Sequence, residues 1–100
     1  MVTVQRVTKL FDQFNGNIFA GKLRRPKFEI DKMDTEVGYC IDDDGHIVIG
    51  IADDLNGQLL MCTLIHEMVH LWQIQNKKKV GHGPEFQKWK KEITHYGFNI

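Results

Sequence analysis

The sequence predicts a compact α+β fold with an N-terminal helix, a three-stranded and mostly antiparallel sheet, and two further helices. Two patterns support this. Apolar residues recur at helical spacing in the first and last parts of the chain, whereas residues 26–51 hold short segments typical of strands. A length of 100 residues, with 42% hydrophobic and 26% charged residues, is that of one ordinary globular domain covering residues 1–100.

The first expected element is an amphipathic helix over residues 3–15. Its apolar residues stand three or four positions apart and are Val4, Val7, Leu10, Phe11 and Phe14. The segment Asn15-Gly16-Asn17 should end this helix, because asparagine and glycine are common just past helix termini.

Three short strands are expected next. Phe28 and Ile30 alternate with charged residues after Pro26 and predict the first strand. Residues 37–41 predict the second strand and residues 46–51 the third, which should run antiparallel to the second.

The turn between the second and third strands is predicted from Asp42-Asp43-Asp44-Gly45. Aspartate favours turns, and Gly45 can adopt a positive φ angle without steric cost. A calcium loop would require alternating oxygen ligands, a glycine at the sixth position and a glutamate at the twelfth, and this pattern is absent. We therefore interpret the segment as a tight acidic turn.

The longest predicted helix runs from Asn56 or Gly57 to about Gln75. It is apolar around most of its circumference, so it should be buried between other layers. Its apolar residues are Leu59, Leu60, Cys62, Leu64, Ile65, Met68, Val69, Leu71, Trp72 and Ile74. Two histidines and a glutamate also lie within it, and burying such groups is costly unless they have partners.

A last helix is expected from Pro84, because proline suits the first turn of a helix. Gly97 should end it. The residues expected to face the core are Phe86, Trp89, Ile93 and Tyr96. Trp72 and Trp89 lie on the apolar faces of their helices, so we interpret both as core aromatics and not as base-stacking platforms.

The motif His66-Glu67-Met68-Val69-His70 is the strongest functional signal in the chain. Residues four apart on a helix lie on the same face, so His66 and His70 can present two imidazoles to one metal ion. Glu67 stands next to the first of them, where it can take a proton from a metal-bound water. His82, twelve residues after His70 and between two glycines, is the candidate third ligand.

A zinc ion with three protein ligands and one open position is typical of a catalytic site, whereas structural sites fill all four positions. Bound zinc lowers the pKa of its water from about 15.7 toward 7 and polarises a substrate carbonyl. With Glu67 as general base, these residues predict a zinc-dependent hydrolase with one Zn²⁺ per chain. The third strand, residues 47–51, is expected to border the cleft and pair with an extended protein or peptide substrate.

A donor to the tetrahedral oxyanion is also expected, and three residues are open alternatives: His46, His95 and Tyr96. Cys40 and Cys62 lack the CxxC spacing of a zinc ribbon. Ligands at Cys62, His66 and His70 would spread along about 12 Å of helix, too far for one tetrahedral ion. We interpret both cysteines as small buried apolar residues.

The formal net charge is zero, but acidic and basic residues are separated along the chain. Residues 29–54 hold nine acidic residues against Lys32 alone, whereas six lysines and two glutamates follow Asn76. The C-terminal lysines are compatible with DNA binding, although a solvated lysine face is the simpler interpretation. The sequence has neither a membrane-spanning stretch nor a secretory signal, so we expect an intracellular monomer in the cytoplasm, nucleoid or nucleus.

Two segments of the chain, Thr63–His70 and Gly81–Phe86, resemble the SprT-like (Spartan-type) zinc metalloprotease family. The resemblance extends to the segments Leu10–Asn15, Phe19–Leu23, Gly38–Cys40 and Tyr96–Ile100. It implies a zincin-like fold, zinc on His66, His70 and His82, and Glu67 as catalytic base. It also implies DNA-associated or DNA-crosslinked proteins as a substrate class, with DNA repair as the setting.

Two other functional classes stay open from the sequence. One is a zinc-binding DNA- or protein-interaction module without turnover, although a purely structural site has no need of Glu67. The other is a hydrolase of a different amide or ester, because the motif specifies an activated water and not its target.

Overall fold

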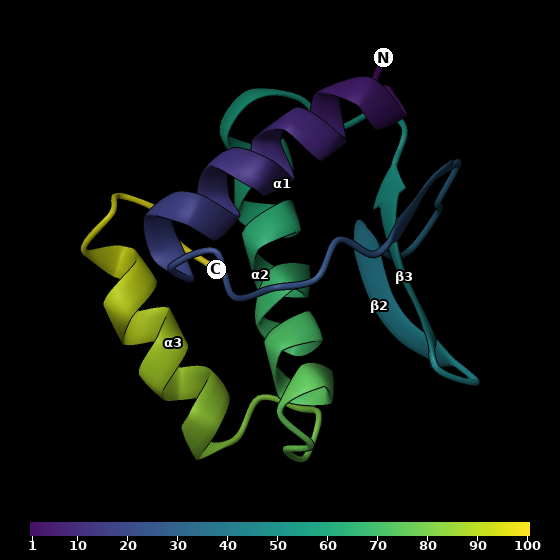
Figure 1. Cartoon of the computed structure of the whole chain (residues 1–100). Coiled ribbons are helices and arrows are strands. Elements are labelled where there is room, and N and C mark those ends of the chain that lie inside the picture. The colour runs from purple at the N-terminus through teal and green to yellow at the C-terminus, as the bar shows by residue number, and fades with distance from the viewer.

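The computed structural model describes residues 1–100 and has three helices and a three-stranded sheet (Figure 1). In chain order the elements are α1 (Val4–Ile18), β1 (Lys27–Asp31), β2 (Gly38–Asp43), β3 (His46–Ala52), α2 (Gly57–Gln75) and α3 (Pro84–Thr94). The predicted α+β class and the predicted order of elements are confirmed.

Helix α1 continues three residues beyond its predicted end, to Ile18. Asn15 does not end the helix; instead, its side chain bonds to the segment that follows. Its Nδ2 donates to the Leu23 carbonyl and its Oδ1 accepts from the Leu23 N–H, both at 3.0 Å. This pair of bonds fixes the chain where it turns back from α1 toward β1.

The sheet has the strand order β1-β3-β2. As predicted, β2 pairs antiparallel with β3, from Gly38 opposite Ile51 to Asp43 opposite His46. However, β1 pairs with β3 in parallel, so the sheet is mixed. Strand periodicity alone could not reveal this, because β1 and β3 are neighbours in the sheet while β2 separates them in the chain.

The central position of β3 contradicts the expectation that residues 47–51 pair with a substrate peptide. Both edges of β3 already form ladders, one with β1 and one with β2. The outer edges of the sheet belong to β1 and β2. Only these two strands can offer free backbone groups to an extended peptide.

The predicted acidic turn joins β2 to β3. Asp44 and Gly45 adopt φ angles of 51° and 89°, the two positive values of a type I′ hairpin turn. The Asp42 Oδ1 atom accepts a hydrogen bond from the Gly45 N–H at 2.9 Å. The turn therefore follows from local sequence, as expected.

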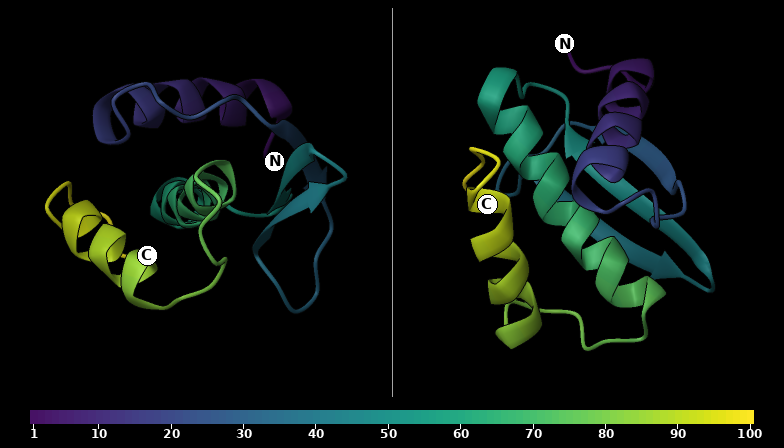
Figure 2. Two further views of the ribbon diagram at one scale, coloured as in Figure 1. Left: turned by 60° about the horizontal axis from the view of Figure 1, so that its bottom comes forward. Right: turned by 60° about the vertical axis from the view of Figure 1, so that its left-hand side comes forward.

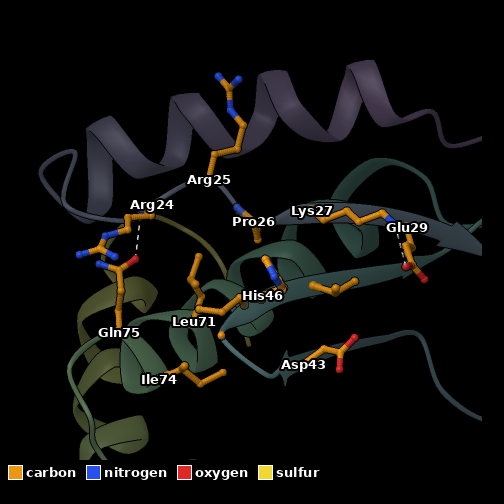
Figure 3. A pocket seen from close by; sticks show the side chains of 13 residues that line it. Arg24, Arg25, Pro26, Lys27, Glu29, Asp43, His46, Leu71, Ile74 and Gln75 are labelled. Atoms are coloured by element: carbon orange, nitrogen blue, oxygen red, sulfur yellow. Dashed lines mark hydrogen bonds and ion pairs between the residues drawn. The ribbon is translucent and has the colours of Figure 1, made fainter.

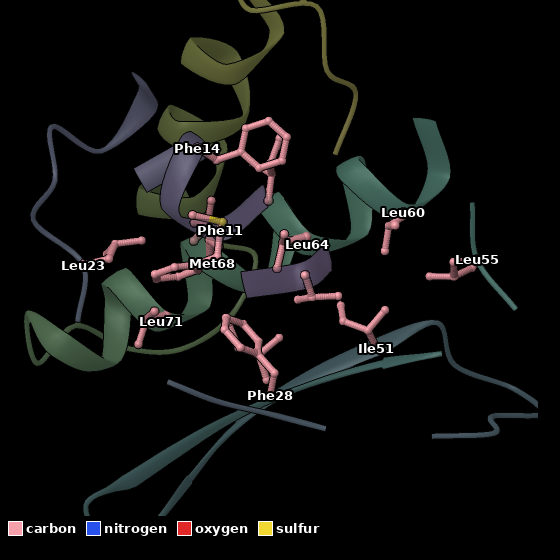
Figure 4. Close-up of a cluster of buried hydrophobic side chains, with 14 of the residues drawn as sticks. Phe11, Phe14, Leu23, Phe28, Ile51, Leu55, Leu60, Leu64, Met68 and Leu71 are labelled. Atoms are coloured by element: carbon pink, nitrogen blue, oxygen red, sulfur yellow. The ribbon is translucent and has the colours of Figure 1, made fainter. Parts of the chain in front are cut away.

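Helix α2 lies at the centre of the molecule, with α1, α3 and the sheet arranged around it (Figure 2). Figure 4 shows how its side chains Leu64 and Met68 meet those of α1 and the sheet. Phe11 of α1 and Phe28 of β1 pack edge to face with ring centroids 5.4 Å apart. The predicted burial of α2 is confirmed for most of its apolar residues, but Leu59 is 55% exposed, and Cys62, Trp72 and Ile74 are only partly buried.

Helix α3 buries Phe86 and Ile93, as predicted. The Trp89 ring packs against Trp72 with centroids 5.5 Å apart, and both are partly buried against the core. The prediction for Tyr96 is wrong, because α3 ends at Thr94 and the Tyr96 side chain is 48% exposed.

None of the helices combines the length and the apolar character that crossing a membrane would require.

Candidate metal centre and active-site groove

The three predicted histidine ligands lie together in the structure. His66 and His70 stand one turn apart on α2, and His82 reaches them from the loop between α2 and α3. The Nε2 atom of His66 lies 3.3 Å from Nε2 of His70 and 3.2 Å from Nε2 of His82. One ligand atom from each histidine lies within 4.8 Å of the other two.

These separations suit one metal ion. Two nitrogens that each lie about 2.0–2.1 Å from a tetrahedral ion are about 3.3 Å apart. Imidazole is a good ligand for zinc and for several other transition metals, so the donor set is compatible with zinc without being unique to it. The cluster could therefore hold a metal ion of this class.

The buried Phe86 ring forms an apolar wall behind all three histidines. Its centroid lies 4.9 Å from that of His66, 5.2 Å from that of His70 and 4.7 Å from that of His82. Close packing against one rigid ring restricts the rotamers of the three imidazoles. The sequence predicted Phe86 as a core residue but not this contact.

Both helical histidines also have a partner at the opposite ring nitrogen. The Nδ1 atom of His66 lies 3.2 Å from the Ile100 carbonyl oxygen, and Nδ1 of His70 lies 2.8 Å from Oε1 of Gln73. Such partners are typical of metal-binding histidines, because a bond at Nδ1 fixes the tautomer and leaves Nε2 for the metal.

The electrostatic environment favours neutral imidazoles. Burial lowers the pKa of His66. The bond to the Ile100 carbonyl opposes this shift, whereas the neighbouring His70, His82 and Lys90 act in the same direction as burial. Burial also lowers the pKa of His70, with His82 as a second cause in that direction. The neutral ring is the form that binds a metal ion, so the protein environment favours the competent state.

Glu67 is only 6% exposed. Burial and the nearby carboxylate of Glu36 raise the pKa of Glu67 to about 7. A Cβ atom added to Gly38 would lie 3.3 Å from Glu67 Oε2, which shows that the start of β2 lies directly against this carboxyl group. A carboxyl group with this pKa can both accept and return a proton near neutral pH.

A groove of about 490 Å³ opens beside His66 and Glu67. Its walls come from the segment before and at the start of β2, from the first turns of α2, and from the end of the chain. The lining residues are Thr35, Glu36, Val37, Gly38, Leu59, Cys62, Thr63, His66, Glu67, Asn99 and Ile100. The groove therefore brings a candidate base and a candidate metal ligand to one accessible surface.

None of the three candidate oxyanion donors lines this groove. His46 lies at the start of β3, and His95 and Tyr96 are exposed residues that follow α3. The cysteines have no metal-binding role in the structure, since both are free and neither belongs to the ligand cluster. They are partly buried, whereas the sequence predicted full burial.

The largest hollow in the molecule, drawn in Figure 3, shares no lining residue with this groove. It has a volume of about 720 Å³ and is bounded by residues 24–27, the β2–β3 hairpin and the C-terminal half of α2. Its lining includes Arg24, Lys27 and His46, with Leu71 and Ile74 contributed by α2. It contains neither Glu67 nor any of the three clustered histidines, so its size does not mark the chemical centre.

Sequence reasoning missed Glu36 and Gln73 as contributors to the site. Glu36 gave no signal, because its effect on Glu67 arises only when the segment before β2 packs against α2. Gln73 did give a sequence signal, because an amide side chain inside so apolar a helix requires hydrogen-bonding partners.

The model of the SprT-like family matches residues 7–100. This chain belongs to the SprT-like family. The SprT-like family is of metalloprotease type, and the predicted resemblance is thereby confirmed over nearly the whole chain. A search of curated proteins finds no match to this SprT-like chain.

Proposed function

We propose that this SprT-like protein is a zinc-dependent endopeptidase in which Glu67 is the general base. The observation that carries the proposal is the convergence of three imidazole nitrogens beside a buried glutamate that lines an open groove. A site that only stabilised the fold would need neither the base nor the accessible groove.

In this proposal His66, His70 and His82 would hold the metal ion through Nε2. When bound, zinc would acidify a water molecule and polarise the scissile carbonyl. Glu67 would take the proton from that water and transfer it to the leaving amine.

The substrate we propose is an extended protein segment that lies in the groove along the start of β2. The groove contains residues 35–38, and the outer edge of β2 has no strand partner. An extended peptide could hydrogen-bond to this edge and pass in front of Glu67. This role replaces the one expected for β3, whose edges are both paired.

Proteins bound or crosslinked to DNA are the substrate class we favour. Two observations support this: membership of the SprT-like family, and the exposed lysines at positions 77–79 in the segment that leads to His82. Lysines on a loop near the site could attract a nucleic-acid backbone. The proposal predicts that single-stranded DNA increases cleavage of a DNA-binding protein more than cleavage of an unfolded protein that does not bind DNA.

The decisive experiment compares the wild type with Glu67→Gln, each loaded with zinc. The variant should bind one zinc per chain with wild-type affinity, because Glu67 is not among the clustered ligands. Its rate of peptide-bond cleavage should fall by roughly 10²–10⁴, the usual contribution of a general base. Zinc content and the appearance of new N-termini are the two measurements.

A matched control is Glu92→Gln, which makes the same change at an exposed helical position on α3. This variant should retain wild-type cleavage. Full activity in Glu67→Gln would refute the assigned mechanism. A wild type that binds zinc but cleaves no protein, with or without DNA, would instead favour a non-catalytic interaction module or a hydrolase of another bond.

A further inference from the structure

Gln73 is a buried polar residue that connects two parts of the histidine cluster. It lies on α2, three residues after His70, and its side chain is 1% exposed. An amide buried to this extent must satisfy its hydrogen bonds within the protein. All of its partners belong to His70 or to the residue that precedes His82.

The bonds to Gly81 fix the orientation of the Gln73 amide. Its Nε2 lies 3.0 Å from the Gly81 carbonyl oxygen, and its Oε1 lies 3.3 Å from the Gly81 backbone nitrogen. A carbonyl oxygen only accepts, and a backbone N–H only donates. In a flipped amide, Oε1 would face the Gly81 carbonyl oxygen and Nε2 would face the Gly81 N–H, so neither hydrogen bond could form. Oε1 must therefore be the atom nearer to His70.

This orientation determines the state of His70. Oε1 of Gln73 can only accept a hydrogen bond, and it lies 2.8 Å from Nδ1 of His70. Nδ1 must therefore carry the proton, which leaves the Nε2 lone pair of the neutral ring directed at His66 and His82. The same oxygen that sets this tautomer also holds the Gly81 N–H, one residue before His82.

We propose that Gln73 is a positioning residue for the metal centre, which orients His70 through Nδ1 and holds the Gly81–His82 segment against α2. One buried amide would thus position two candidate metal ligands, His70 and His82, that stand twelve residues apart in the sequence. The inference rests on the proposed metal site, but its first prediction concerns the metal-free protein.

The first measurement is the tautomer of His70 in the metal-free wild type. A long-range ¹H–¹⁵N spectrum, recorded where the ring is neutral, should show the proton on Nδ1. In Gln73→Leu the ring should instead show a mixture of tautomers, and affinity for zinc should fall by roughly 10- to 100-fold. A wild-type His70 protonated on Nε2 would overturn the proposal.

Gln75→Leu is a matched control on the same helix. Its Nε2 donates to the Lys22 carbonyl at 2.9 Å, and its Oε1 accepts from the Arg24 N–H at 2.7 Å. Gln75 thus ties another loop to α2 with one bond to a backbone carbonyl and one to a backbone N–H, but it forms no hydrogen bond with a histidine. The variant should keep the His70 tautomer and wild-type zinc affinity even if it lowers the melting temperature.

Gln73→Glu separates the orientation of His70 from the attachment of Gly81 to α2. It is also the test variant if Gln73→Leu does not fold. It retains the acceptor for His70 and loses the donor to the Gly81 carbonyl, so the Nδ1–H tautomer should persist while zinc affinity falls. Wild-type zinc affinity in a folded Gln73→Leu would refute the positioning role. A wild type that binds no zinc would refute the proposed function, and the tautomer spectra would still decide whether Gln73 orients His70.

Discussion

Cys40 illustrates how burial at a single residue changes its chemistry. Burial, with the nearby carboxylates of Glu67 and Asp42, raises the pKa of the Cys40 thiol to about 12. An unfolded cysteine titrates near 8.5. The folded state therefore holds the thiol proton more tightly than the unfolded state. As pH rises from about 8.5 toward 12, the Cys40 thiol makes folding progressively less favourable.

This shift predicts slow alkylation of Cys40. In the variant Cys62→Ala, where Cys40 is the sole thiol, the alkylation rate of the folded protein should rise tenfold per pH unit from pH 7 to pH 10. In the denatured chain it should level off near pH 8.5. Rates measured in buffer and in urea test this, with Cys40→Ala/Cys62→Ala as the blank. A folded-state plateau near pH 8.5 would contradict the assignment.

At the same scale, the site residues divide by how local their roles are. His66, Glu67 and His70 were predictable, because one turn of helix places them together. His82 was predictable from its separation of twelve residues from His70 and from the glycines on either side of it. Phe86 and Glu36 act through contacts with residues from other elements, so no spacing rule could assign their roles. Gln73 shares a helical face with His70, but its bonds to Gly81 join α2 to the following loop, and spacing could not predict them.

At the scale of elements, the Tyr39 side chain ties all three strands together. It projects from β2 and lies over Gly50, its direct neighbour on β3. Its hydroxyl reaches β1, where it lies 3.0 Å from Glu29 Oε2 and 2.9 Å from Asp31 Oδ2. Burial and these two carboxylates raise the pKa of Tyr39. A side chain at position 50 would occupy the space of the ring.

Gly50→Ala should therefore destabilise the protein by about 1–3 kcal/mol, the usual cost of overpacking. The reason is overlap between the new Cβ and the Tyr39 ring. In a Tyr39→Ala background the same change should cost much less, because the ring is absent. Urea unfolding of the four proteins in this cycle measures the coupling. Equal costs in the two backgrounds would show that the ring does not press on Gly50.

At the scale of the whole molecule, the hydrophobic core and the cluster of three histidines are largely separate. The core cluster has 19 buried residues from all helices, from strands β1 and β3 and from the segments between elements, and of these Phe86 also contacts the three histidine rings. The metal-free chain should therefore stay folded, unlike small zinc domains that unfold without metal. Metal binding should add to this stability by linkage.

Zinc at 100 times its dissociation constant should stabilise the wild type by about 2.7 kcal/mol. For a domain of this size that corresponds to a rise in melting temperature of roughly 10 °C or more. His82→Ala should lose most of this rise, whereas His46→Ala, which changes an exposed histidine in the larger hollow, should keep it. Calorimetry with zinc and with chelator tests this. An unchanged rise in His82→Ala would remove His82 as a ligand.

The sequence by itself determined the presence of the helices, the acidic hairpin turn and the spacing of His66, Glu67 and His70 on one turn of helix. Each depends on residues a few positions apart, where backbone geometry alone decides which side chains meet. Only the tertiary structure decided that β3 is central, that Gln73 links His70 to Gly81, and that burial raises the pKa of Glu67. These features depend on contacts between elements, whose order in space need not follow their order in the chain.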